Sequence, residues 1–225
     1  MKWLLVMRGL PGSGKSTLSR ALSKRLRWPI IDKDDIKDIL DGHISEAGGL
    51  AYKAMFNVAR RQLLQGLDVI CDSPLTFSIS YEKARSIVAE THTTLAIVEC
   101  ICSDEQEWSQ RINGRKQLQL PAHHQTDWDK LQTNRAKIEN VMDYPITDPR
   151  IIVDTVRPLD EVVSEIIEWF GQLSEKKVSI SHTEVQAVKY WKDPYGSWSD
   201  LPETMLEDLN QIRHNTHLTP PLENL

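Results

Sequence analysis

The stretch VMRGLPGSGKSTL, from Val6 to Leu18, decides the fold of this 225-residue chain. Within it, residues 9–16 fit the phosphate-binding pattern G-x-x-x-x-G-K-[ST]. Glycines at these positions let backbone N–H groups point at phosphate oxygens where a Cβ atom would intrude. Lys15 can reach the β- and γ-phosphates of a nucleotide as a catalytic residue, and the hydroxyl of Ser16 can ligate Mg²⁺. A chance glycine-rich turn is the alternative interpretation.

The sequence on either side of this loop favours the phosphate-binding interpretation. The apolar run Trp3–Met7 is typical of a buried parallel strand. After the loop, Leu18, Leu22 and Leu26 recur at helical spacing. A helix that begins at the loop adds its positive N-terminal end to the site. We therefore predict a nucleotide-binding loop formed by Gly9, Leu10, Pro11, Gly12, Ser13, Gly14, Lys15, Ser16 and Thr17.

Strand and helix patterns alternate along most of the remaining chain. Apolar and β-branched runs predict further strands at 28–32, 67–72, 93–103 and 149–155. Helical patterns occupy 34–40, 50–66, 80–91, 103–114, 127–142 and 158–171. This alternation predicts an α/β fold, the three-layer sandwich of a P-loop NTPase with a mostly parallel five-stranded sheet.

Local signals set the expected ends of these elements. Ser103 is a good helix cap, and Asn113-Gly114 is expected to end that helix in a turn. Residues 115–126 have no clear period and are expected to form a mobile lid of the nucleoside-kinase type. The last helix is expected to stop at Gly171. We predict a domain at 1–172 and a partly ordered C-terminal extension at 173–225.

Composition excludes several classes of protein. The net charge of −5, from 32 acids and 27 bases, gives no sign of a dedicated polyanion-binding protein. Cys71, Cys100 and Cys102 have apolar neighbours and are too few for a disulfide framework. The apolar run at the N-terminus is too short for a secretion signal or a membrane span. We expect a cytoplasmic protein with reduced thiols and no membrane partner.

Aspartates follow two of the predicted strands. The carboxyl ends of parallel strands line the ligand crevice of an α/β sheet, so Asp34 or Asp35 can face the γ-phosphate and accept a proton from a substrate hydroxyl. Capping of the short helix is the alternative role for this pair. Asp72 ends the strand at 67–72 and occupies the usual place of a carboxylate that orients Mg²⁺.

Arginines and one tyrosine complete the set of candidates. Arg111 and Arg115 are four residues apart on a helix that leads into the predicted lid, where they can neutralise charge that develops during phosphoryl transfer. A solvated helix face would look similar. The helix at 50–66 can form one wall of an acceptor pocket, with Tyr52 as a candidate contact.

The sequence resembles the small P-loop kinases, a group that includes gluconate kinases, chloramphenicol phosphotransferases, zeta-type toxins and the kinase domain of phage polynucleotide kinase. The resemblance runs from about Trp3 to Gly171 and rests on the motifs GLPGSGKSTL, DKDDIK, VICDSPL, QRINGRK and IIVDTVRPLDEVV. The polynucleotide kinase match is the most detailed. It implies that Asp34 is the base and that Lys37 holds substrate phosphate, and we expect Asp35, beside the base, to contact the substrate as well. Arg157 occupies the region that packs against adenine in such kinases.

Taken with the residues, the resemblance implies an ATP-dependent kinase that uses Mg²⁺ and phosphorylates an acceptor hydroxyl. Lys37 stands where the polynucleotide kinases have arginine, which weakens bidentate recognition of phosphate. The segment after Gly171 is acidic and carries no phosphatase signature. We therefore expect a small-molecule acceptor. A 5′-hydroxyl nucleic-acid kinase and a nucleotide-dependent binding module without turnover are the alternatives.

Overall fold

The structure is a computed structural model that describes residues 2–117 and 126–180. Most of the predicted lid, 118–125, and residues 181–225 of the predicted extension lie outside the described residues. The strands are β1 (Trp3–Arg8), β2 (Ile30–Asp32), β3 (Val69–Asp72), β4 (Thr94–Ile101) and β5 (Arg150–Asp154). The helices are α1 (Lys15–Leu26), α2 (Lys33–Leu40), α3 (Ala47–Leu64), α4 (Ser78–Thr91), α5 (Glu105–Gln117), α6 (Trp128–Met142) and α7 (Leu159–Ile180).

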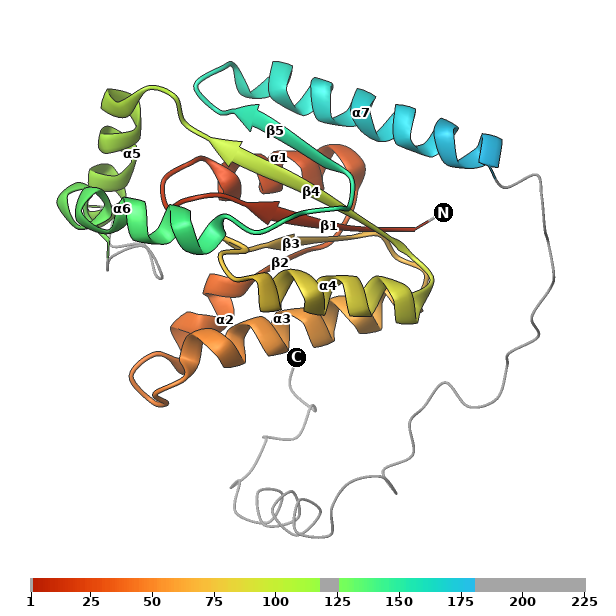
Figure 1. The fold of residues 1–225 in the computed structure, drawn as a ribbon, viewed down its shortest axis with the longest axis horizontal. Coiled ribbons are helices and arrows are strands. Elements are labelled where there is room, and N and C mark those ends of the chain that lie inside the picture. Colours follow the sequence, from red (N-terminus) through yellow and green to blue (C-terminus); the bar gives the residue numbers. More distant parts are fainter. Residues whose placement is uncertain (1, 118–125, 181–225) are drawn as a thin grey trace, which may run out of the picture. The chain divides into compact units, whose positions relative to one another are not determined.

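The five strands form one sheet in the order β2-β3-β1-β4-β5. All four strand pairs are parallel, and the register places Asp32 of β2 beside Asp72 of β3. Figure 1 shows the sheet between two helical layers, with α1 and α7 on one face and α3 and α4 on the other. The predicted three-layer α/β fold is confirmed. Parallel strands end at the same edge of the sheet, so the loops after β1, β2, β3 and β4 meet there.

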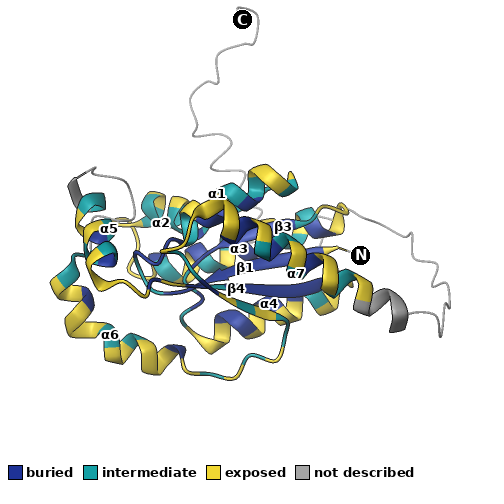
Figure 2. Ribbon diagram, turned by 90° about the horizontal axis from the view of Figure 1, so that it is seen from above, coloured by how far each residue is buried: buried dark blue, intermediate teal, exposed yellow. Residues whose placement is uncertain are grey.

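The core lies on both faces of the sheet. All six residues of β1 are buried, as expected for a central strand covered by helices (Figure 2). One apolar cluster joins the sheet to α1 and α7 and includes Leu5, Leu22 and Phe170. The other joins it to α3 and α4 and includes Val6 and Phe56. This packing fixes the strand ends that carry the candidate site.

Helix α5 differs from the sequence expectation at both ends. Asp104 caps it instead of Ser103, because its Oδ1 accepts from the backbone N–H groups of Gln106 and Glu107 at 2.8 and 2.9 Å. The expected turn at Asn113-Gly114 is wrong, since the helix continues to Gln117. Tertiary packing overrides the local turn signal here. The side chain of Asn113 accepts a hydrogen bond from the backbone of Trp128 in the next helix.

Helix α7 also runs further than expected. It continues through Gly171 to Ile180. Phe170 is buried in the core, and Leu173 packs against the same cluster beyond the glycine, which favours a continued helix. The domain boundary at 172 remains a prediction. None of the helices in the described part of the chain is long and apolar enough to cross a membrane.

Candidate active site

The glycine-rich loop after β1 is fixed by its neighbours in space. Gly12 and Gly14 have φ angles of 78° and 85°, which residues with a side chain rarely adopt. A Cβ atom at Gly12 would lie 2.5 Å from the side chain of Ile112, and one at Gly14 would lie 2.8 Å from the hydroxyl of Thr155. The indole N–H of Trp108 donates to the Pro11 carbonyl at 2.7 Å. Contacts from α5 and from the segment after β5 therefore hold the loop in shape.

Lys15 begins α1 and folds back over the loop. Its ammonium group donates to the Leu10 carbonyl at 2.8 Å. Burial lowers the pKa of Lys15, while the nearby carboxylate of Asp72 opposes this shift. A half-buried cation beside the backbone N–H groups of the loop suits the phosphates of a nucleotide.

One cavity of about 100 Å³ brings the main candidates together, and we call it the phosphate-side cavity. It joins the loop to the ends of β2 and β3 and to α5. Besides Pro11 and Gly12 of the loop, its lining includes five further residues predicted from the sequence, namely Lys15, Ser16, Asp34, Asp72 and Arg115. These residues are up to 100 positions apart in the chain. Their convergence is the strongest geometric feature of the site.

Asp72 lies at the floor of this cavity, where it is 2% exposed. Its carboxylate accepts a hydrogen bond from the Ser19 hydroxyl at 2.9 Å. Asp32 stands beside it in the sheet register. Burial, together with the charge of Asp72, raises the pKa of Asp32 to about 7. Asp72 and Ser16 line the same cavity, and their carboxylate and hydroxyl oxygens are donors of the kind that Mg²⁺ prefers.

The structure separates Asp34 from Asp35, the adjacent aspartates of the DKDDIK motif. Asp34 lines the phosphate-side cavity, and its backbone N–H donates to Oδ1 of Asp32 at 2.8 Å, which caps α2. The side chain of Asp34 pairs with Lys33, with 2.5 Å between Nζ and Oδ1. Asp35 is exposed and lines none of the four cavities described here. The geometry therefore favours Asp34 over Asp35 as the residue that faces the phosphates.

A second cavity, of about 360 Å³, lies on the α1 side of the loop, and we call it the nucleotide-side cavity. Arg115 lines both this cavity and the phosphate-side cavity. Arg111 and Arg157 line only the nucleotide-side cavity of the two. The guanidinium of Arg111 donates to the hydroxyl and carbonyl of Thr155 at 2.7 and 2.8 Å and also pairs with Glu107. Arg111 therefore anchors α5 to the segment after β5.

A third cavity, of about 600 Å³, lies next to the phosphate-side cavity between α2, α3 and the start of α4. We call it the lysine-lined cavity. Lys37 and Tyr52, both predicted as substrate contacts, line it. The Tyr52 hydroxyl accepts from the backbone N–H of Leu75 at 3.0 Å, and burial raises the pKa of this tyrosine. Tyr52 is therefore a wall residue that also fixes the turn after β3.

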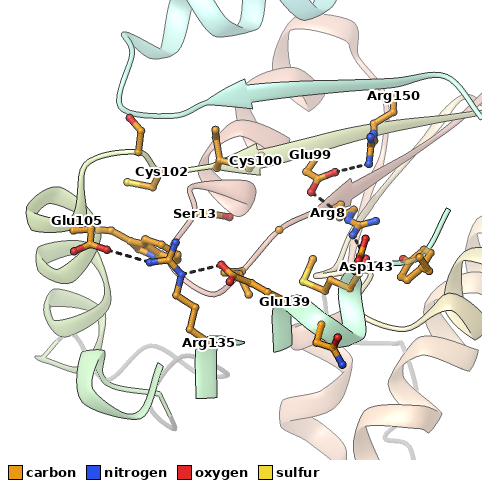
Figure 3. Close-up of a pocket in the computed structure, with 18 residues that line it drawn as sticks. Arg8, Ser13, Glu99, Cys100, Cys102, Glu105, Arg135, Glu139, Asp143 and Arg150 are labelled. Atoms are coloured by element: carbon orange, nitrogen blue, oxygen red, sulfur yellow. Dashed lines mark hydrogen bonds and ion pairs between the residues drawn. The ribbon is translucent and has the colours of Figure 1, made fainter. Parts of the chain in front are cut away.

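The largest of the four cavities, about 740 Å³, lies on the α6 side of the loop. Figure 3 shows its arginines paired with glutamates. Arg8 and Arg150 flank Glu99, with N–O distances of 3.4 and 3.3 Å. Arg135 pairs with Glu105 and Glu139. Because these arginines are already neutralised, the geometry favours the smaller phosphate-side cavity as the phosphate site.

The three cysteines do not form a metal site within the described residues. Cys71, Cys100 and Cys102 are free thiols, and all three are buried. Among the described residues, no group of three or more histidine, cysteine or acidic side chains is arranged to hold a metal ion. The predicted Mg²⁺ ligands, Ser16 and Asp72, suit an ion whose remaining ligands are nucleotide phosphates and water molecules.

Comparison with known proteins places this geometry in a family. A family model named AAA_33 and described as an AAA domain matches residues 4–139, which is more than half of the chain. The chain belongs to the AAA_33 family. The matched segment of this AAA_33 protein contains the glycine-rich loop, Asp34, Asp72 and both arginines of α5. No curated protein sequence matches the chain.

Solved structures show the same fold. A protein of Chloroflexus aurantiacus j-10-fl, described as a kinase, aligns with a TM-score of 0.59 at 24% identity over 74% of this chain and 97% of its own. A gluconokinase of Sinorhizobium meliloti 1021 aligns with a TM-score of 0.55 at 20% identity, over 79% of this chain and 97% of its own. Kti12 of Chaetomium thermophilum, solved with ADP-AlF3, aligns with a TM-score of 0.53 at 16% identity. The alignment covers 73% of this chain and 97% of Kti12. The AAA_33 protein thus has the fold of small P-loop kinases.

Several residues that shape the site were not identified from the sequence. Trp108 and Thr155 contact the glycine-rich loop from about 95 and 140 positions away, and no local pattern marks such contacts. Ser19 follows the loop on α1 and could have been found as an inward-facing polar residue one turn from Lys15. Asp32 is the first residue of the DKDDIK motif and ends a predicted strand, which was an available signal.

Proposed function

We propose that this AAA_33 protein is an ATP-dependent kinase that phosphorylates a hydroxyl group of a small-molecule acceptor. The observation that carries the proposal is the phosphate-side cavity, where Lys15, Asp34 and Arg115 meet from three separate segments. A binding module would need the loop and a metal ligand but not a carboxylate aimed at the same space. The carboxylate of Asp34 therefore favours an enzyme.

The glycine-rich loop and α1 form the donor half of the site. The backbone N–H groups of the loop and the N-terminus of α1 are proposed to bind the phosphates of ATP, and Lys15 to contact the β- and γ-phosphates. Ser16 and Asp72 are proposed to hold Mg²⁺, directly or through water. When bound, Mg-ATP supplies the phosphoryl group and the metal charge that offsets the charge on its oxygens.

Asp34 is proposed as the base of the reaction. It takes the proton of the acceptor hydroxyl while the acceptor oxygen bonds to the γ-phosphorus and the bond to the β-phosphate oxygen breaks. The electron pair of the broken bond leaves with ADP. Asp32, which caps α2 beneath Asp34, positions this carboxylate.

The arginines of α5 have different proposed roles. Arg115 faces both the nucleotide-side and the phosphate-side cavity, so it is proposed to stabilise charge on the transferring phosphoryl group. Arg111 is bonded to Thr155 and is proposed to position α5. Arg157 lies in the nucleotide-side cavity, where it pairs with Glu165, and is proposed to lie beside the adenine.

The similar structures support a nucleotide-dependent reaction. Kti12 was solved with ADP-AlF3, and the gluconokinase is named for a small hydroxylated acid. The net charge of −5 favours a small acceptor over a nucleic acid. The three buried thiols support the expectation of a cytoplasmic location, where cysteines stay reduced.

The proposal is tested by nucleotide binding and turnover in Lys15→Ala. Titration calorimetry should show that this variant binds Mg-ATP at least about tenfold more weakly than the wild type, because a charge-assisted contact to phosphate is lost. Lys24→Ala changes an exposed lysine on the same helix and serves as the control. Equal Mg-ATP affinity in wild type and Lys15→Ala would refute the nucleotide site.

A further inference from the structure

The lysine-lined cavity opens beside the proposed base. It shares Pro74 with the phosphate-side cavity, so the two spaces are neighbours. Lys33 lines the lysine-lined cavity while its ammonium group pairs with Asp34. A molecule bound in this cavity can therefore bring one of its hydroxyl groups to Asp34. Its volume of about 600 Å³ lies in the range of about 300–1,000 Å³ that small-molecule sites occupy.

The charged side chains that line this cavity are all positive. They are Lys33 and Lys37 of α2, Lys53 of α3 and Lys83 of α4. No carboxylate is among the described residues that line it. A cavity lined by lysines from three helices and by no acidic side chain favours a negatively charged ligand.

Lys53 and Lys83 are the lysines of this set that are exposed. Neither forms an ion pair within the described part of the chain. The glutamates nearest to Lys83 along α4 are paired with arginines, Glu82 with Arg85 and Glu90 with Arg60. The hydrogen bond from Arg60 lowers the pKa of Glu90 and the charge of Lys83 contributes, but Lys83 forms no ion pair with Glu90 among the described residues. The exposed ammonium groups of Lys53 and Lys83 therefore remain accessible to an anion from solvent.

The first turn of α4 adds to the positive potential. Thr76, Phe77, Ile79 and Ser80 line the cavity around this turn. The turn has no side-chain cap and no acidic residue. The N-terminus of this 14-residue helix thus presents its partial positive charge to the same space. Figure 1 shows α4 beside α3 on this face of the sheet.

We propose that the acceptor is a small molecule that carries an anionic group, a carboxylate or a phosphate, in addition to the hydroxyl that is phosphorylated. Lys53 and Lys83 bind the anionic group, and the hydroxyl lies at Asp34. The apolar side chains of Phe56 and Phe77 contact the carbon skeleton between the two groups. This inference rests on the proposed kinase function and names the class of its acceptor.

The test measures binding separately from turnover. Wild-type protein is saturated with Mg-AMP-PNP, so that the glycine-rich loop is occupied, and is titrated with matched probes in a calorimeter. The probe pairs are D-gluconate with sorbitol, glycerol 3-phosphate with glycerol, and thymidine 3′-monophosphate with thymidine. At least one anionic probe should bind at least about tenfold more tightly than its neutral partner. The pair that responds distinguishes carboxylate from phosphate.

A double variant locates the anion site. Lys53→Gln/Lys83→Gln should weaken binding of the anionic probe by at least about tenfold, since two ammonium groups are removed. Lys24→Gln, on the opposite face of the sheet, should leave it unchanged. Mg-AMP-PNP affinity should be equal in all three proteins. The inference is overturned if no anionic probe binds, if neutral probes bind equally well, or if the double variant binds the anion as the wild type does.

Turnover and salt dependence separate the remaining outcomes. If ADP forms with a neutral acceptor at a rate that the double variant does not change, the anionic acceptor is refuted while the kinase function stands. If anionic probes bind at the lysines but no ADP forms with any acceptor, the anion site stands and the kinase function is refuted. A 5′-hydroxyl oligonucleotide that binds far more tightly than the mononucleotide, with steep salt dependence, would overturn the small-molecule assignment.

Discussion

Lys33 and Asp34 form an ion pair in which Nζ lies 2.5 Å from Oδ1. Lys33 is 8% exposed, and its ammonium group lies 5.5 Å from the centre of the Tyr52 ring. The backbone N–H of Asp34 is held at the same time by the carboxylate of Asp32. The proposed base is therefore fixed through both its backbone and its side chain before an acceptor enters.

Replacement of this lysine should impair the reaction without impairing nucleotide binding. In Lys33→Met, the Asp34 side chain loses the partner that holds its position, and misplacement of a catalytic group costs rate. We expect kcat/KM for the acceptor to fall by about tenfold or more, while the Kd for Mg-ATP stays at the wild-type value. Steady-state kinetics and calorimetry measure the two quantities.

Lys33→Arg is the matched control for this prediction. It keeps a cation next to Asp34 and should recover part of the lost rate. A Lys33→Met enzyme with wild-type kinetics would show that the ion pair has no role in positioning the base.

A buried arginine on β1 should matter for stability. Arg8 is 4% exposed, pairs with Glu99, contacts the Met142 carbonyl and lies 4.7 Å from the centre of the Tyr144 ring. Removal of Arg8 leaves Glu99 with only its exposed partner Arg150, and it also removes the buried contacts with the Met142 carbonyl and the Tyr144 ring. We expect Arg8→Met to lower the free energy of unfolding by about 3 kcal/mol, as measured by urea denaturation.

Arg150 provides the comparison for Arg8. It pairs with the same Glu99, but its side chain is 38% exposed. Exposed pairs contribute little, so Arg150→Met should cost at most about 1 kcal/mol. Equal losses in the two variants would contradict the conclusion that burial makes the Arg8 pair important.

The cysteines should be unreactive in the folded protein. Burial raises the pKa of Cys100 to about 12 and raises the pKa values of Cys71 and Cys102 as well. Thiols react as thiolates, and at pH 8 a thiol of pKa about 12 is ionised in only about one molecule in 10⁴. Raising the pH toward 12 should therefore increase reactivity, and lowering it should not.

The measurement is a titration of thiols with Ellman's reagent at pH 8. The native protein should show almost no fast reaction, and the denatured protein should show all three thiols. A thiol that reacts within seconds in the native protein would contradict the burial of that cysteine.

Features that depend on neighbours in sequence were predictable. The apolar run before the glycine-rich loop and the helical repeat after it define β1 and α1 within the sequence itself. Asp34 and Asp72 were found because aspartates at the ends of parallel strands converge at one edge of the sheet. The positions of β1 and α1 follow from the local sequence, so they could be predicted without knowledge of the packing between distant segments.

Features that depend on packing between distant segments were not predictable. Asn113-Gly114 is a turn signal, but contacts of Trp108 and Ile112 with the loop keep α5 helical through it. Gly171 is a stop signal, but buried Phe170 before it and partly buried Leu173 after it pack against the same core cluster and keep α7 helical. The resemblance to polynucleotide kinases points to Asp34 rather than Asp35 as the base, but only the three-dimensional arrangement shows that Asp34 lines the phosphate-side cavity.

The central claim is that the glycine-rich loop holds ATP while Asp34 activates the acceptor, and Asp34→Asn tests it most directly. The substitution keeps the size of the side chain and removes its ability to take a proton. Single-turnover transfer of the γ-phosphoryl group to an acceptor found by screening should fall by about 100-fold or more, and the Kd for Mg-ATP should not change. Transfer at the wild-type rate, or loss of Mg-ATP binding along with transfer, would contradict the account.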